Sequence, residues 1–179
     1  HITLKLDQPP FDDIRVRHAM QMALDLETIN ETYLLGYANI TPMGNIDASW
    51  PGYFVPFDEW PEETRYKYAY DVAEAERLLD EAGYPRGADG VRFTVGWDIV
   101  PLWGHDQDLV MVIAGYWDKI GVDVTVELIA DLAVRSDRRK QATHGGILQG
   151  APRHRICCDF ISGASGAYYG DPAPGIGIT

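Results

Sequence analysis

One stretch of the sequence brings aromatic, acidic and imidazole side chains close together. Residues 97–108 carry three acids, Asp98, Asp106 and Asp108, and no arginine or lysine. Because a ligand carboxylate is normally met by arginine, this stretch favours a cationic or neutral ligand, unless another part of the protein supplies the arginine. For the tryptophans, packing in a sheet or loop is an equally good interpretation. The candidate binding residues are Trp97, Asp98, Trp103 and His105, with Pro101 between them.

Common signatures of catalysis and metal binding are absent from the sequence. It contains no G-x-S-x-G elbow, no G-x-x-x-x-G-K-[ST] loop and no H-E-x-x-H pair. His144, beside two glycines, is interpreted as a loop residue and not as a base. The two cysteines, Cys157 and Cys158, are adjacent, so we expect free thiols and no zinc site. We therefore expect no enzyme, metal or cofactor, although five histidines and many acids leave a hydrolase of unknown class as an alternative.

Length and charge restrict the class of protein further. A chain of 179 residues is long enough for one domain, and no apolar run approaches the length that spans a bilayer. The formal net charge of -12 argues against nucleic acid as a partner, because binding to phosphates requires lysine and arginine. The one basic cluster, at residues 135–140, is interpreted as a solvated helix face.

A strand, a helix and a second strand are predicted around the candidate residues. Apolar residues alternate with polar ones from Val91 to Ile99 and again from Val122 to Leu128, and the helix between them ends at Gly121. Such a βαβ unit, at 91–129, places its two strands parallel in one sheet. Ligands of open α/β sheets lie beyond the carboxyl ends of the strands. The residues at 97–108 are therefore the first binding candidate.

The remaining elements are predicted from periodicity and from helix-capping residues. Residues 1–6 alternate as a strand, and residues 8–36 contain two helices, the first capped by Asp12 or Asp13. Arg15 and Arg17 lie early in that helix, where positive charge opposes the helix dipole, so we expect carboxylates or backbone carbonyls to hold them. Residues 37–70 are predicted as a long loop, in which function and packing explain the aromatic residues equally well. Further on we expect a helix at 71–83, a helix at 135–143, a short strand at 146–150 and a loop from 151 onward.

Three segments match motifs that occur in one family in the same order. Pro10–Ile29 is similar to P-F-x-D-x-R-V-R-x-A followed by A-x-D-x-x-x-I. Tyr70–Pro85 is similar to Y-D-P-x-x-A-x-x-L-L-x-E-A-G-Y, with Val72 where proline is usual, and Tyr116–Val126 is similar to x-L-x-K-I-G-I-x-V-x-L. Together they resemble extracellular solute-binding protein family 5, the dipeptide, oligopeptide and nickel-binding type. The match is good over residues 1–130 and poor over 131–179.

The resemblance implies an architecture and a role. The fold is expected to be α/β, a periplasmic-binding-protein-like lobe with a mixed sheet flanked by helices. Residues 1–179 are then a partial C-terminal lobe, with 1–7 as a strand between lobes and the N-terminal lobe missing from this chain. Such proteins close two lobes on a small solute, such as a peptide, and an ABC permease in the membrane reads the closed state. The implied location is periplasmic or extracellular, with or without a lipid anchor, in a bacterium or archaeon.

A second binding candidate follows from the resemblance alone. After the short strand, family members usually carry a G-W-x-x-D-x-x-D-P type segment, whose acid meets the amino end of a peptide. This sequence lacks that tryptophan and its acids are displaced, so Asp171 before Pro172 is also explained as a turn residue. The candidates that carry over are Asp159, Tyr168, Tyr169 and Asp171. A sensor with the same fold, and a truncated product that binds nothing, remain as alternatives to transport.

Overall fold

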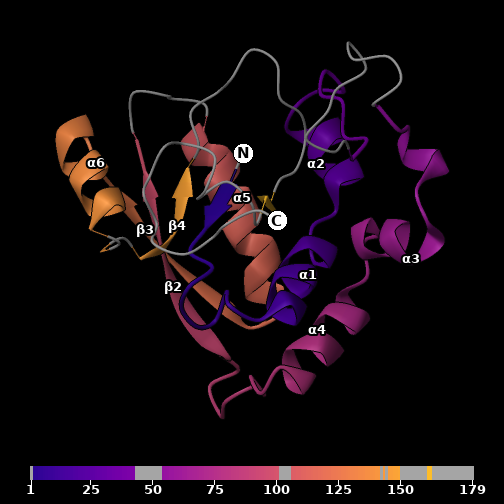
Figure 1. The fold of residues 1–179 in the computed structure, drawn as a ribbon, viewed down its shortest axis with the longest axis horizontal. Helices are drawn as coiled ribbons and strands as arrows, with labels where there is room; N and C mark the ends of the chain where they lie inside the picture. The colour runs from indigo at the N-terminus through magenta and orange to yellow at the C-terminus, as the bar shows by residue number, and fades with distance from the viewer. Residues whose placement is uncertain are drawn as a thin grey trace.

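The computed structural model describes residues 2–42, 54–100, 106–141, 143, 145–149 and 161–162. Its centre is a mixed sheet with the strand order β3-β2-β4-β1-β5 (Figure 1). The strands are β1 (Ile2–Leu4), β2 (Phe93–Ile99), β3 (Val122–Leu128), β4 (Gly146–Gln149) and β5 (Ile161–Ser162). The α/β class and the mixed sheet are as predicted.

The predicted βαβ unit is confirmed. Strand β2 leads into α5 (Asp106–Lys119), and β3 returns parallel to β2, in register from Phe93 opposite Val122 to Ile99 opposite Leu128. The link between α5 and β3 turns at Gly121, whose φ of 80° lies in the region that glycine adopts without strain. The expected strand at 146–150 is β4, and it also runs parallel to β2. Three carboxyl ends therefore lie at one edge of the sheet.

The other two strands run in the opposite direction. Strand β1 pairs antiparallel with β4, and β5 pairs parallel with β1. The strand predicted at 1–6 is present as β1, in the interior of the sheet and not at its edge. Strand β5 lies where the sequence predicts only loop, because two residues are too few to produce a readable alternation.

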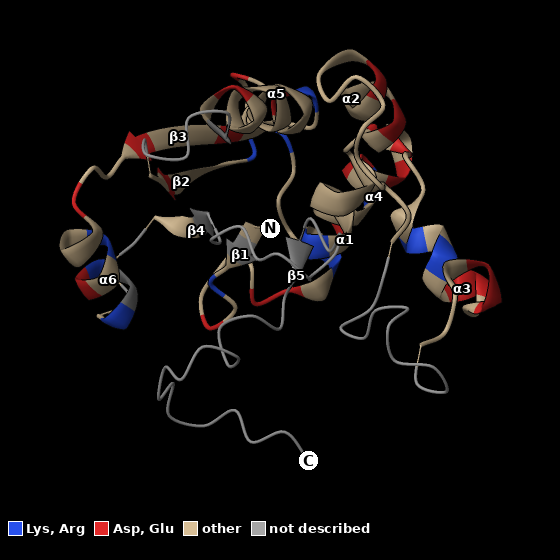
Figure 2. Cartoon of the chain, turned by 90° about the horizontal axis from the view of Figure 1, so that it is seen from above, with Lys and Arg blue, Asp and Glu red and all other residues tan. Residues whose placement is uncertain are grey.

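Helices α1 (Ile14–Met22), α2 (Leu26–Thr32) and α4 (Val72–Glu81) begin at aspartate caps. The carboxylates of Asp13, Asp25 and Asp71 accept hydrogen bonds from free backbone amides of the first turn. Helices α1 and α4 pack together at one end of the sheet, and α6 (Leu132–Lys140) lies at the other end (Figure 2).

The arginines at the start of α1 are held as the sequence predicts. Arg15 pairs with Asp13 at 2.6 Å and donates to the Glu81 carbonyl at 2.6 Å. Arg17 donates to the carbonyl of Phe11 at 2.6 Å. These contacts neutralise positive charge that would otherwise oppose the helix dipole.

The segment predicted as a long loop contains short helices in its described part. They are η1 (Phe57–Glu59), α3 (Glu62–Arg65) and η2 (Tyr66–Tyr68), and none is long enough to show a helical period in the sequence. The rings of Phe57, Trp60 and Tyr68 pack edge to face with centroids 5.3–5.8 Å apart. Trp60 also donates its Nε1 hydrogen to the Val55 carbonyl at 2.9 Å. For these aromatics the packing interpretation is the better supported one.

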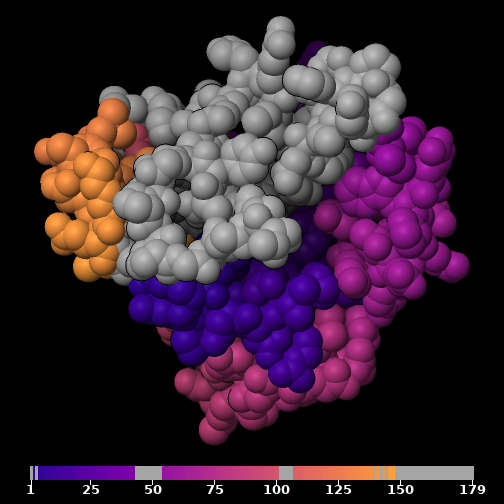
Figure 3. Space-filling model, viewed as in Figure 1, coloured from indigo at the N-terminus to yellow at the C-terminus, as the bar shows by residue number. Residues whose placement is uncertain are grey.

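The apolar core joins the sheet to α1, α4 and α5. Trp97 on β2 and Trp117 on α5 are both buried, with ring centroids 5.5 Å apart. Trp117 donates its Nε1 hydrogen to the Met20 carbonyl of α1 at 2.9 Å, so one side chain links two helices through the core. Figure 3 shows the face on which the N-terminal segment lies between α6 on one side and α3 and α4 on the other.

In the part of the chain that the structure describes, no helix is long and apolar enough to cross a membrane.

Candidate functional site

Asp98 is a buried carboxylate at the carboxyl edge of the parallel strands. It is the penultimate residue of β2, and its side chain is 2% exposed. Carboxylates are seldom buried this completely unless they are paired or bound. Its neighbours in the sheet are Glu127 of β3, directly opposite, and Leu148 of β4.

Arg138 of α6 reaches both carboxylates. Its Nη1 and Nη2 donate to the two carboxylate oxygens of Glu127 at 2.7 Å each, which is a bidentate pair. The same Nη1 lies 3.5 Å from Oδ2 of Asp98, at the limit of hydrogen-bond distance. Among the described residues, Oδ2 of Asp98 accepts no hydrogen bond. We call Asp98, Glu127 and Arg138 the carboxyl-edge cluster.

The environment raises the pKa of Asp98. Burial is the main cause, because it disfavours the charged form, and the negative charge of Glu127 acts in the same direction. Arg138 and a hydrogen bond from the Gly145 backbone lower the pKa and only partly offset these effects. By contrast, the bidentate pair with Arg138 lowers the pKa of Glu127. The two acids of the cluster are therefore perturbed in opposite directions, as is common at functional sites.

A close backbone contact fixes the geometry beside Asp98. The Gly96 amide donates to the Gly145 carbonyl at 2.8 Å. A Cβ added to Gly96 would lie 2.7 Å from the Cα of Gly145, and one added to Gly145 would be closer still to Gly96. Only glycine allows β2 and the residue before β4 to approach this closely.

The structure separates the two described candidates of the 97–108 stretch. Trp97 points into the core against Trp117 and is 1% exposed, which supports packing as its role, although its Nε1 has no hydrogen-bond partner among the described residues. Asp98 points to the other face of the sheet, toward α6, because successive strand residues alternate. The remaining candidates, Trp103, His105, Asp159, Tyr168, Tyr169 and Asp171, lie outside the described residues.

Glu127 and Arg138 were not predicted as site residues. Glu127 appears in the sequence as the polar partner in a strand alternation, and Arg138 as part of a solvated basic cluster. For Glu127 the sequence does contain a useful signal, which is its position in the strand. Glu127 is one residue from the end of a predicted parallel strand, as Asp98 is, so these two acids lie opposite each other once the strands are paired. Nothing in the local pattern indicates that Arg138 turns back onto them.

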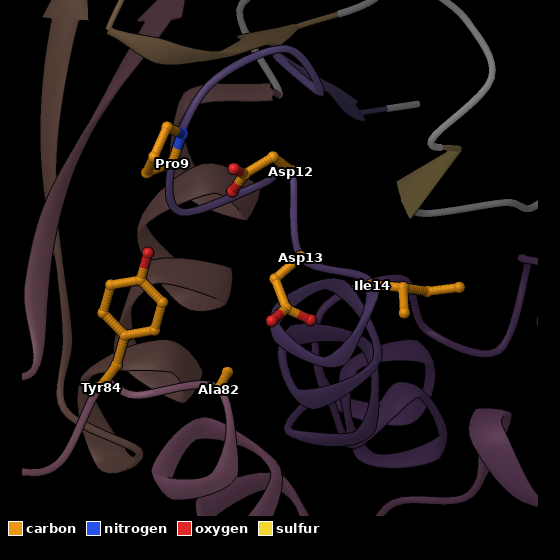
Figure 4. Close-up of a pocket in the computed structure, with 6 residues that line it drawn as sticks. All are labelled: Pro9, Asp12, Asp13, Ile14, Ala82 and Tyr84. Carbon is orange, nitrogen blue, oxygen red and sulfur yellow. The ribbon is translucent and has the colours of Figure 1, made fainter.

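A separate pocket opens at the opposite, amino edge of the strands. It has a volume of about 540 Å³ and is lined by Pro9, Asp12, Asp13, Ile14, Ala82 and Tyr84 (Figure 4). Tyr84 packs on Phe93, the first residue of β2, with ring centroids 5.0 Å apart. Asp13 pairs with Arg15, and none of the six described side chains that line the pocket has a buried polar atom without a hydrogen-bond partner, in contrast to Asp98. In the described ranges, no three histidine, cysteine or acidic side chains gather as they would around a metal ion.

Residues 1–152 match the sequence model of one family, described as bacterial extracellular solute-binding proteins, family 5 middle. A curated relative is the glutathione-binding protein GsiB of Salmonella typhimurium, which is 33% identical over 87 residues. That alignment covers 49% of this chain and 15% of GsiB, so the chain spans only a small part of the relative.

Solved structures share the fold. The periplasmic binding protein DppA from Helicobacter pylori, in complex with the peptide STSA, has a TM-score of 0.61 and 20% identity, over 82% of this chain and 25% of DppA. The binding protein MoaA from A. tumefaciens R10, in complex with mannopinic acid, has a TM-score of 0.64 and 25% identity. That match covers 87% of this chain and 28% of MoaA.

Proposed function

Because the chain belongs to the bacterial extracellular solute-binding proteins of family 5, we propose that it forms part of a receptor that captures a small solute for an ABC importer. The role is to hold the solute and not to transform it. The single observation that carries this proposal beyond family membership is the buried, incompletely paired carboxylate of Asp98 at the carboxyl edge of the parallel strands.

The position of Asp98 agrees with where such sheets bind ligands. In open α/β sheets the ligand lies beyond the carboxyl ends of the strands, and β2, β3 and β4 all end at this edge. A buried carboxylate there costs stability and is explained if it serves binding. The pocket at the amino edge lacks this property.

The mechanism that we propose is closure of two lobes on the solute. This chain supplies part of the C-terminal lobe, and the rest of the protein supplies the other contacts, consistent with the 15% of a curated relative that the chain spans. A solute that touches both lobes stabilises the closed state and shifts the open–closed equilibrium toward it. A membrane permease then recognises the closed form.

The similar proteins support the solute class and the location that we propose. Their names include glutathione, the peptide STSA and mannopinic acid, which supports a peptide-like or other small organic solute. The family description, extracellular, and the periplasmic description of DppA support a location in the periplasm or outside the cell.

A titration followed by nuclear magnetic resonance tests this proposal on the chain itself. The ¹⁵N-labelled chain is titrated with glutathione, with the tetrapeptide Ser-Thr-Ser-Ala and with mannopinic acid. We expect at least one solute to shift amide signals at the ends of β2, β3 and β4, with weak affinity because the contacts from the other lobe are missing. If all three solutes leave these signals unchanged, or shift only those around Tyr84, the proposal fails.

A further inference from the structure

The carboxyl-edge cluster contains more negative than positive charge. Two carboxylates, Asp98 and Glu127, share the single guanidinium of Arg138. Within the ranges that the structure describes, Glu127 and Arg138 are the charged groups that shift the pKa of Asp98. With both acids ionised, the cluster therefore has one negative charge in excess, and that excess lies next to a buried side chain.

The guanidinium of Arg138 makes its short hydrogen bonds to the more exposed of the two carboxylates. Glu127 is 53% exposed and could be solvated by water, yet it takes both short hydrogen bonds from Arg138. Asp98 is buried and receives only the 3.5 Å contact. A cluster arranged for stability would have the opposite pairing, because an unsatisfied buried charge costs more free energy than an exposed one.

We infer that Asp98 binds the cationic group of the solute. In the solute-free protein, the guanidinium of Arg138 lies near the place beside Asp98 that this cationic group would occupy. This rests on the proposed function and specifies its ligand class. A primary ammonium or guanidinium group on the solute takes the place of the long Arg138 contact. Arg138 keeps its bidentate pair with Glu127 while it moves away from Asp98, so its charge is never left unpaired.

An anionic group does not fit the same place. The two terminal nitrogens of Arg138 already donate to Glu127. A solute carboxylate at this position would meet the excess negative charge of the cluster in a buried environment, where like charges repel strongly. The cluster therefore selects for a cationic solute group and against an anionic one.

Three forms of one peptide test the inference with the same four side chains and different charges at the two ends. Ser-Thr-Ser-Ala is prepared with a free amino end and an amidated carboxyl end, with both ends blocked, and with an acetylated amino end and a free carboxylate. We expect the cationic form to bind roughly ten- to a hundredfold more tightly than the blocked form, as a charge-assisted hydrogen bond implies. The anionic form should bind most weakly.

Matched variants connect this preference to the cluster. Asp98→Asn should remove the preference for the cationic form. Glu127→Gln should weaken binding of the cationic form, because the released Arg138 then pairs fully with Asp98 and competes with the solute. Asp123→Asn is the control: Asp123 is an exposed acid on the same face of β3, removed from the cluster, and its loss should leave the preference unchanged.

The outcomes separate this inference from the proposed function. Equal affinity for the three forms, preference for the anionic form, or an Asp98→Asn variant that behaves like Asp123→Asn would overturn the inference. Failure of the cationic form to bind would also overturn it. If glutathione, unmodified Ser-Thr-Ser-Ala or mannopinic acid still shifts the strand-end signals in those cases, the proposed function stands alone.

Discussion

The two edges of the parallel strands differ in how completely a buried charged side chain is paired. At the amino edge, the side chain of Arg92 is 2% exposed, pairs with Asp80, and donates to the carbonyls of Tyr84 at 2.6 Å and Ile120 at 2.9 Å. At the carboxyl edge, the cation that the described residues bring to buried Asp98 is Arg138, whose Nη1 lies 3.5 Å from Oδ2. Arg92 joins α4, β2 and α5 through satisfied bonds, so the amino edge is built for stability. Among the described residues, the carboxyl edge keeps a buried carboxylate incompletely paired, which is the property on which the proposed binding role rests.

The largest effect is expected in the core that both edges share. Trp117→Ala removes a fully buried ring, its contact with Trp97 and its hydrogen bond to Met20. We expect a loss of about 3–5 kcal/mol in the free energy of unfolding, as for other buried aromatic residues. Urea denaturation followed by circular dichroism measures it, and Met111→Ala on the exposed face of the same helix is the control. A similar loss in both variants would show that α5 has no special coupling to the sheet.

A smaller loss is expected at the amino edge. Arg92→Met leaves the part-buried carbonyls of Tyr84 and Ile120 without this donor, and an acceptor that loses its donor in a fully buried place costs roughly 1–3 kcal/mol, so we expect a loss toward the lower end of that range. Asp80→Asn removes only the exposed partner and should cost less. Both variants should bind solute with unchanged affinity once folded. A change in affinity at equal stability would contradict the expectation that the amino edge contributes to stability and only the carboxyl edge to binding.

At the carboxyl edge we expect stability to change in the opposite direction. The environment raises the pKa of Asp98, so the charged form of this side chain is held at a cost in stability. Asp98→Asn, which is neutral at every pH, should therefore be at least as stable as the parent chain at neutral pH while it loses binding of the cationic peptide. Thermal unfolding beside the peptide titration measures both. An unstable variant would show that Asp98 is a structural residue.

The smallest effect is a pH dependence. Because the folded-state pKa of Asp98 lies above its unfolded value, its contribution to stability is fully present below the unfolded pKa and is lost as pH rises through the folded pKa. The gain in stability of Asp98→Asn over the parent should therefore be smallest below the unfolded pKa of aspartate, about 3.9, and should grow as the pH rises above it. Asp123→Asn serves again as the exposed comparison. A gain that shrinks over this range would mean that Arg138 outweighs burial.

Local patterns predicted most of the fold. Strand alternation, aspartate caps and glycine stops depend on residues that are close in sequence, so β2, α5, β3 and α4 were predicted with small errors at their ends. Short elements escaped for the same reason: η1, α3, η2 and β5 are too brief to show a period.

The site was only partly predictable. Asp98 was predicted as a candidate because ligands of open α/β sheets bind beyond the carboxyl ends of the strands, and the structure adds that its side chain is buried. Arg138 was not, since it lies 11 residues from Glu127 in sequence and its contact depends on how α6 folds back over the sheet. Burial of Trp97 against Trp117 also required the sheet and helix to be placed, because alternation alone does not say which face of a strand is covered.

The paired glycines beside Asp98 have an evolutionary consequence. Neither Gly96 nor Gly145 has a side chain with which to touch a solute, yet alanine at either position would clash with the facing backbone and push β2 and the residue before β4 apart, next to Asp98. In a survey of all single substitutions, selected for solute uptake, both positions should tolerate almost nothing. They would be scored as recognition residues although their contribution is only to leave space.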